Sequence, residues 1–124
     1  LLVDDEKAIA ELEKRMLERL GYKVTSHISS TDALEVFKTR PNSFDLVISD
    51  MSMPNMPGDL FATELRAIRP NIPVIICTGF STRIKEKNIR KLGVNGLLMK
   101  PILKSDLANL VRKVLDESQQ FSSF

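Results

Sequence analysis

The sequence is poor in the residues that build disulfide-linked or zinc-bound scaffolds. Its 124 residues include one cysteine, one histidine and no tryptophan. A single cysteine excludes an internal disulfide framework and suits a reducing compartment. No hydrophobic run approaches the roughly 20 residues that span a bilayer, and the start lacks the charged region and cleavage site of a signal peptide. We therefore expect a cytoplasmic protein without a membrane partner.

The charge balance is close to neutral, and this also limits the function. Eighteen basic residues oppose 16 acidic ones, for a formal charge of +2. Such a charge is too small to indicate direct nucleic-acid binding. The length and the 43% hydrophobic content suit one domain with one core. We expect residues 1–116 to form it, starting inside its first strand as an excerpt from a longer protein. Residues 117–124 form a polar tail, read as a frayed helix end, a linker or a cloning remnant.

Five short hydrophobic runs alternate with longer segments of helical spacing. The runs cover residues 1–3, 22–26, 46–48, 74–77 and 97–99. Three or four consecutive apolar residues, many of them β-branched, are typical of strands buried on both faces. Parallel neighbours need crossover helices, and these crossovers are right-handed. The pattern predicts an α/β fold with a (βα)5 doubly wound, parallel five-stranded sheet.

The helical segments differ in how strongly they are anchored. The first has a stripe of Ile9, Leu12, Met16 and Leu20, and Gly21 follows as a C-terminal cap. The second has Ser30 or Thr31 as a candidate N-cap, the third ends before Pro70, and the fifth carries five large apolar residues between positions 103 and 114. The fourth, residues 82–92, is basic with a narrow apolar stripe. It is either a solvated helix face or a weakly docked, partner-binding surface.

Chemically active side chains follow four of the five predicted strands. Asp4 and Asp5 follow the first strand, Asp50 the third, Thr78 the fourth and Lys100 the fifth. Parallel strands end at one edge of the sheet, where ligands bind in this type of fold, so these groups should converge there. Each residue alone has an ordinary interpretation as a helix cap, a turn former or a strand-end residue. The joint pattern favours a site.

Three neighbouring carboxylates repel one another and need a positive partner. Lys100 offsets one charge, and an oxygen-only donor set suits Mg²⁺ better than zinc, because the sequence has no cysteine–histidine cluster. Magnesium held by few carboxylates leaves positions for phosphate oxygens. A carboxylate such as Asp50 can itself be the nucleophile and become an aspartyl phosphate. These residues therefore point to phosphoryl transfer.

The motifs, taken in order, resemble the receiver domain of two-component response regulators. They are the run from Leu1 to Glu6, Asp50 with Met53-Pro54 and Gly58, Thr78-Gly79, and Lys100-Pro101. The resemblance covers about residues 1–116. It implies a flavodoxin-like sheet with strand order 2-1-3-4-5. It also implies phosphotransfer from the phosphohistidine of a histidine kinase or a histidine phosphotransfer domain, in a signalling module that is not a multiple-turnover enzyme.

The resemblance also implies a role for each site residue. Asp50 would be the phosphoacceptor. Asp5 and Asp50 would bind Mg²⁺ directly, the backbone carbonyl of Ser52 would add a ligand, and Asp4 would act through a water molecule. Thr78 and Lys100 would hold phosphoryl oxygens, and the Lys100–Pro101 bond would be cis.

Two departures from the family pattern concern switching and lifetime. Leu97 stands where the family usually has an aromatic residue that rotates on activation. This rotation is therefore lost as a signal, unless Phe80 takes that role. Ser52 and Phe80 occupy variable positions that tune the access of water to the phosphoryl group.

The fourth helix, fifth strand and fifth helix would form the surface for self-association or an effector. The phrase Pro70–Phe80 is also similar to receivers of hybrid sensor histidine kinases.

Two other functions compete with this interpretation, and two further residues have ordinary structural explanations. A phosphatase of the haloacid dehalogenase type expects an Asp-x-Asp pair and a cap domain, whereas this chain has adjacent aspartates and no room for a cap. A receiver-like interaction domain that works without phosphate stays open because of Leu97. We expect Cys77 to be a buried structural thiol and His27 to end an edge strand without a phosphorelay role.

Overall fold

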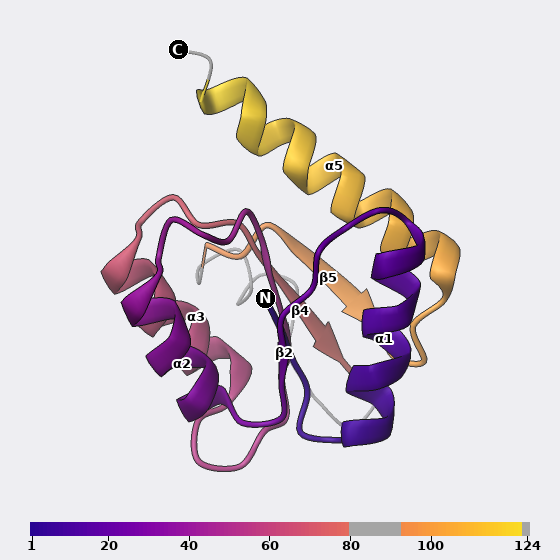
Figure 1. The fold of residues 1–124 in the computed structure, drawn as a ribbon, viewed down its shortest axis with the longest axis horizontal. Helices are drawn as coiled ribbons and strands as arrows, with labels where there is room; N and C mark the ends of the chain where they lie inside the picture. The colour runs from indigo at the N-terminus through magenta and orange to yellow at the C-terminus, as the bar shows by residue number, and fades with distance from the viewer. Residues whose placement is uncertain (80–92, 123–124) are drawn as a thin grey trace.

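The protein is described by a computed structural model that covers residues 1–79 and 93–122. Five parallel strands form one sheet in the order β2-β1-β3-β4-β5. Helices α2 and α3 cover one face, and α1 and α5 cover the other (Figure 1). The predicted fold class and strand order are therefore confirmed. The predicted fourth helix and Phe80 lie outside the described residues.

The elements have the following bounds. The strands are β1 (Leu2–Val3), β2 (Ser26–His27), β3 (Val47–Asp50), β4 (Val74–Thr78) and β5 (Gly96–Met99). The described helices are α1 (Lys7–Arg19), α2 (Ser30–Thr39), α3 (Gly58–Ile68) and α5 (Lys104–Ser122). Asp50 and Thr78 are thus the last residues of β3 and β4, whereas the sequence analysis predicted that they follow the ends of these strands. The residues after Asp116 continue α5 to Ser122, and this helix extends past the body of the sheet (Figure 1).

The second strand is shorter and later than residues 22–26. Only Ser26 and His27 pair with β1, because β1 itself offers just Leu2 and Val3 to pair with. Tyr22 and Val24 instead pack against the hydrophobic cluster on the face that α1 and α5 cover. His27 ends this edge strand as expected.

Helix α1 ends in a Schellman motif, as the glycine in the sequence indicated. Gly21 has φ +98°, and its N–H donates to the carbonyl of Glu18 at 3.0 Å. The N–H of Tyr22 donates to the carbonyl of Leu17 at 3.2 Å, which completes the motif. A side chain at position 21 would be strained in this left-handed conformation.

The N-cap of α2 is one residue earlier than either predicted candidate. Ser29 has an extended backbone, and its hydroxyl accepts from the N–H of Asp32 at 3.4 Å. Ser30 is the first helical residue and is buried. Its hydroxyl donates to the carbonyl of Met56 at 2.8 Å, which ties α2 to the loop after β3. The prediction was wrong because three consecutive hydroxyl residues offer equivalent cap chemistry in sequence.

The buried face of α1 also differs from the predicted stripe. Ala10, Glu13 and Leu17 face the core, whereas Leu12 and Leu20 are exposed. The charged residue Glu13 occupies a core position, so a search for apolar spacing does not find this face. Among the other predicted core residues, Leu60 of α3 and Leu103 before α5 are likewise exposed.

Two hydrophobic clusters hold the layers together. On the α2/α3 face the largest fully buried side chains include Phe37, Phe61 and Leu65, packed with Ile76 of β4. The α1/α5 face is built from the following residues: Leu2, Leu17, Leu46, Ile48, Ile75, Cys77, Leu98, Leu107, Val111 and Val114. Each fully buried side chain of this size contributes about 1.5–3 kcal/mol. Cys77 is buried as predicted, and none of the described helices is long and apolar enough to cross a membrane.

Candidate functional site

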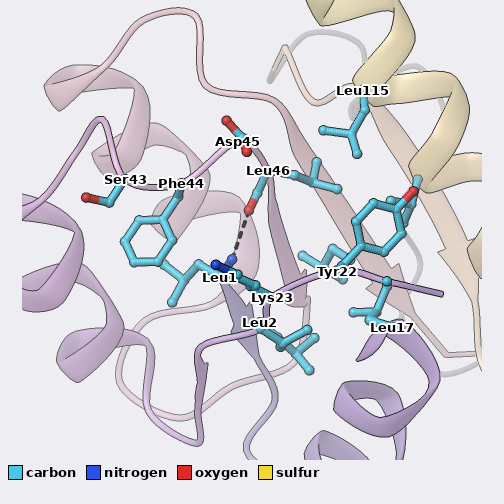
Figure 2. A pocket seen from close by; sticks show the side chains of 14 residues that line it. Leu1, Leu2, Leu17, Tyr22, Lys23, Ser43, Phe44, Asp45, Leu46 and Leu115 are labelled. Carbon is cyan, nitrogen blue, oxygen red and sulfur yellow. Dashed lines mark hydrogen bonds between the residues drawn. The ribbon is translucent and has the colours of Figure 1, made fainter. Parts of the chain in front are cut away.

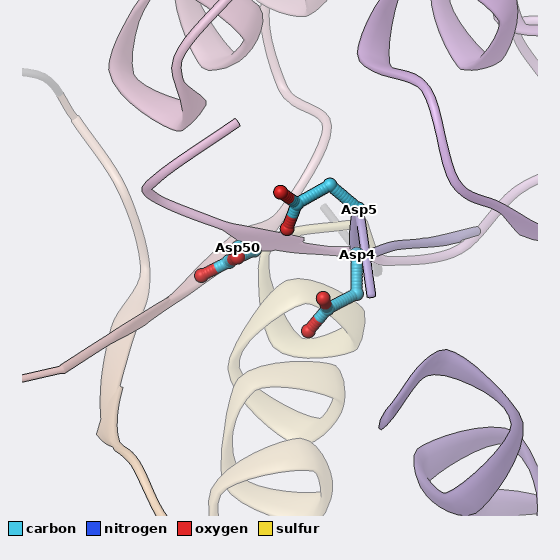
Figure 3. Close-up of side chains that lie close together, drawn as sticks. All are labelled: Asp4, Asp5 and Asp50. Atoms are coloured by element: carbon cyan, nitrogen blue, oxygen red, sulfur yellow. The ribbon is translucent and has the colours of Figure 1, made fainter. Parts of the chain in front are cut away.

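Three carboxylates meet at the carboxyl edge of the sheet. Asp4 and Asp5 directly follow β1, and Asp50 ends the neighbouring strand β3. One carboxylate oxygen from each lies within 4.8 Å of the others, and Figure 3 shows Asp4 and Asp5 leaving the chain in opposite directions. Asp4 and Asp50 are buried and Asp5 is exposed. The structure thus brings together the acidic residues that were predicted from the sequence, and Asp5 exposes this group to solvent.

Lys100 joins the two buried carboxylates. Its Nζ lies 3.1 Å from Oδ2 of Asp4 and 3.2 Å from Oδ1 of Asp50. The backbone positions it, because the N–H of Lys100 donates to the carbonyl of Thr78 at 2.7 Å. The bond from Lys100 to Pro101 is cis, as the resemblance implied.

The ionisation of the site reflects burial and mutual charge. Burial raises the pKa of Asp50, the Lys100 ammonium opposes this shift, and the Asp4 carboxylate adds to it. Burial alone would lower the pKa of Lys100, but its hydrogen bond and charge interaction with Asp4, and then those with Asp50, raise it above the ordinary value. Lys100 therefore stays protonated. Among the described residues, the single cation Lys100 balances one of the three carboxylates, which leaves an excess of negative charge.

The loop between β3 and α3 is held tightly against Asp50. The N–H of Gly58 donates to the carbonyl of Met51 at 2.9 Å. A Cβ at position 58 would lie 2.5 Å from the carbonyl oxygen of Asp50, so only glycine fits there. Asn55 has φ +72° at the tip of this loop, and Ser52 lines a shallow hollow together with Asp5. The structure thereby gives a physical reason for a glycine that the sequence identified only as part of a motif.

Thr78 and Leu97 approach the site from β4 and β5. Thr78 is buried, and its hydroxyl donates to the carbonyl of Gly79 at 3.4 Å, so it is turned toward its neighbour in the chain. Its partner in the sheet register is Met99, next to Lys100. Leu97 is partly buried and packs against the α2/α3 cluster. Thr78 therefore lies at the same carboxyl edge of the sheet as the carboxylates, but its hydroxyl does not form a hydrogen bond with them.

A cavity lined mainly by apolar side chains lies at the opposite edge of the sheet. It has a volume of about 450 Å³, and its walls include Leu1, Tyr22, Leu46 and Leu115 (Figure 2). The cavity holds none of the residues that carry the predicted chemistry.

The donor set at the acidic edge fits a hard divalent cation. Asp4, Asp5 and Asp50 offer only oxygen atoms, which is the chemistry that Mg²⁺ and Ca²⁺ prefer and zinc does not require. Two of the carboxylates are already buried, so part of their desolvation cost is met by folding. The exposed carboxylate of Asp5 leaves the group accessible from solvent.

The fold and the site together define a doubly wound α/β domain with an acidic, lysine-bridged pocket at its strand ends. The family model described as the response regulator receiver domain matches residues 1–112. The chain superposes on the crystal structure of a response regulator receiver domain protein from Clostridium thermocellum with a TM-score of 0.92 and 32% identity, covering 97% of this chain and 95% of that one. This chain belongs to the response regulator receiver domain family.

Curated relatives are much longer than this chain. It is 33% identical over 117 residues to the sensor kinase CckA of Brucella abortus, which covers 94% of this chain and 12% of CckA. It is 33% identical over 119 residues to the two-component response regulator ARR10 of Arabidopsis thaliana, which covers 96% of this chain and 21% of that protein. The comparison therefore concerns the receiver portion of these relatives.

Proposed function

We propose that this chain accepts a phosphoryl group on Asp50 from the phosphohistidine of a histidine kinase or a histidine phosphotransfer domain. The observation that carries the proposal is the lysine bridge: Lys100 contacts both Asp4 and Asp50 within a group of three carboxylates. This arrangement keeps Asp50 beside a cation that can turn to an incoming phosphoryl oxygen. Membership of the receiver family supports the same chemistry.

Magnesium is the metal we assign to the acidic group. Asp5 and Asp50 would bind it directly, the backbone carbonyl of Ser52 would add a ligand, and Asp4 would act through a water molecule. When bound, the ion would supply positive charge that neutralises the carboxylates and the phosphoryl oxygens. Among the described residues, the shared hollow beside Asp5 and Ser52 supports this set.

The positions of the side chains support the following phosphoryl step. A carboxylate oxygen of Asp50 attacks the phosphorus in line and forms an O–P bond, while the P–N bond to the donor histidine breaks. The electron pair leaves with the imidazole nitrogen, which takes up a proton. Lys100 and the Thr78 hydroxyl would then contact two of the phosphoryl oxygens. Attack by water later releases phosphate and restores Asp50, so the domain carries out slow self-dephosphorylation and no turnover of a separate substrate.

Signalling would follow from a shift between two states of the surface. The phosphoryl group adds charge and acceptor oxygens, and Thr78 would leave the Gly79 carbonyl to reach one of them. The neighbouring surface exposes Met99 at the end of β5 and Leu103 just before α5, two apolar side chains available to an effector or a second copy. Leu97 cannot rotate as an aromatic ring does, so the threonine would carry the change.

The sensor kinase relative supports a place for this receiver within a longer signalling protein. We propose residues 1–116 as the receiver unit, with the continuation of α5 leading out of it. A hybrid sensor histidine kinase is the candidate, since a sensor kinase is among the relatives that match over nearly the whole chain.

Beryllofluoride with Mg²⁺ tests the proposal, because it mimics a phosphoryl group on a carboxylate. We expect amide NMR shifts at Asp50, Thr78 and Lys100 in the wild type and none in Asp50→Asn. An unchanged spectrum in the wild type would overturn the proposal and favour an interaction domain that works without phosphate.

A further inference from the structure

Glu13 is a buried carboxyl that the proposed mechanism does not use. It lies on α1 in the face formed with Ala10 and Leu17, and its residue is only 3% exposed. Its Oε1 is buried and has no hydrogen-bond partner among the described residues. Burying a carboxyl without a partner costs several kcal/mol. A residue that weakens the core in this way calls for a compensating role.

The strand register places the acidic site on the sheet face that α1 covers. Four residues of the α1/α5 cluster lie one in each of β1, β3, β4 and β5: Leu2, Ile48, Ile75 and Leu98. Side chains alternate along a strand, so the residues two positions further share this face. These residues are Asp4, Asp50, Cys77 and Lys100. The α1/α5 face therefore carries the lysine bridge at its upper edge.

Helix α1 approaches this edge from the correct end. It starts at Lys7, just after Asp5, and runs back along the sheet away from the site. Glu13 is one turn closer to the strand ends than Leu17, which is about 6 Å along the helix. Because Leu17 packs in the α1/α5 cluster, Glu13 lies between this cluster and the carboxylates.

The charged groups that act on Glu13 are those of the site, in agreement with this placement. Burial raises the pKa of Glu13 to about 7, and the charge of Asp4 adds to this shift, Lys100 opposes it and Asp50 adds further. From β4 the facing titratable group is the Cys77 thiol, whose own pKa is raised by burial and then by Glu13. The residues of α5 in the cluster are apolar.

We propose that Glu13 is a positioning residue of the metal site, a fourth carboxylate outside the coordination shell that strengthens the binding of a divalent cation by Asp4, Asp5 and Asp50. This inference rests on the proposed function. Buried charges are only weakly screened by solvent and salt. The negative charge of Glu13 therefore attracts a cation bound at the neighbouring Asp4 and Asp50 even at moderate ionic strength. Glu13 thus lowers the stability of the fold and raises the affinity of the site for a divalent cation.

Mg²⁺ titration of three chains tests the inference: wild type, Glu13→Gln and Glu11→Gln. Glu11 is an exposed glutamate on the same helix, so its variant removes one charge without touching the core. At about pH 8, where Glu13 is ionised, we expect Glu13→Gln to weaken Mg²⁺ binding on the order of tenfold and Glu11→Gln by less than about twofold. At about pH 6 the affinities of the wild type and Glu13→Gln should differ by no more than about twofold, because Glu13 is then largely protonated.

Equal affinity of the wild type and Glu13→Gln at the higher pH would overturn the role of Glu13 while leaving the proposed function intact. A wild type that binds no Mg²⁺ would overturn both. Urea unfolding of each variant without metal serves as the folding control, and Glu13→Leu provides a second variant without the charge. A Glu13→Leu chain with wild-type Mg²⁺ affinity at both pH values would also contradict the inference.

Discussion

Gly58→Ala is the substitution for which the structure gives the clearest expected cost. The added Cβ would lie 2.5 Å from the carbonyl oxygen of Asp50 and 2.9 Å from Cα of Met51. Both atoms belong to the backbone, so no side chain can turn away. Reaching an ordinary contact of 3.4 Å needs a movement of nearly 1 Å, which also strains the hydrogen bond from Gly58 to Met51. Overpacking and the weakened hydrogen bond together should lower the free energy of unfolding by about 2–4 kcal/mol.

Urea unfolding followed by far-UV circular dichroism measures this change, with Gly79→Ala as the matched control. A Cβ at Gly79 meets nothing within 4 Å among the described residues. We expect Gly58→Ala to lower the urea midpoint by about 1–2 M and Gly79→Ala to shift it by less than about 0.5 M. Since the displaced atoms belong to Asp50 and Met51, Gly58→Ala should also weaken Mg²⁺ binding. Equal midpoints for both variants would refute the packing argument for Gly58.

Three further predictions concern stability. Ser29→Ala should lower the free energy of unfolding by about 0.5–1 kcal/mol, because the hydroxyl caps α2 through a long bond of 3.4 Å; an unchanged urea midpoint would contradict the cap. Glu13→Leu should stabilise the chain increasingly between about pH 4.5 and about pH 7, by up to about 3 kcal/mol. The sign follows because the folded state holds the Glu13 proton over this range while the unfolded state releases it, so wild-type stability falls as pH rises; equal pH profiles of the two chains would contradict it. Lys100→Met should cost about 2–3 kcal/mol, since it leaves two buried carboxylates unpaired, and Mg²⁺ should restore part of this loss in thermal melts.

The architecture could be predicted because buried parallel strands leave a strong trace in sequence. The run Val74–Cys77 is apolar throughout, and in the structure its residues are buried on both faces. The acidic group was predictable for a related reason: the carboxyl ends of parallel strands coincide, so residues far apart in sequence such as Asp4 and Lys100 must meet. Neither inference needed the position of a helix.

Local features depended on interactions that a sequence pattern does not display. Glu13 occupies a core position on α1, so the apolar stripe through Leu12 pointed to the wrong face of the helix. The predicted cap was Ser30 or Thr31, but Ser29 caps the helix, and the Ser30 hydroxyl donates instead to the carbonyl of Met56. Such tertiary contacts, and the burial of a charged side chain, become visible only in the folded chain.

Phosphorylation of Asp50 is the central claim, and intact-mass spectrometry after incubation with acetyl phosphate tests it most directly. The wild type should gain the mass of one phosphoryl group when Mg²⁺ is present and none when the metal is chelated, and Asp50→Asn should gain none under either condition. No gain in the wild type, or an equal gain in Asp50→Asn, would contradict the account.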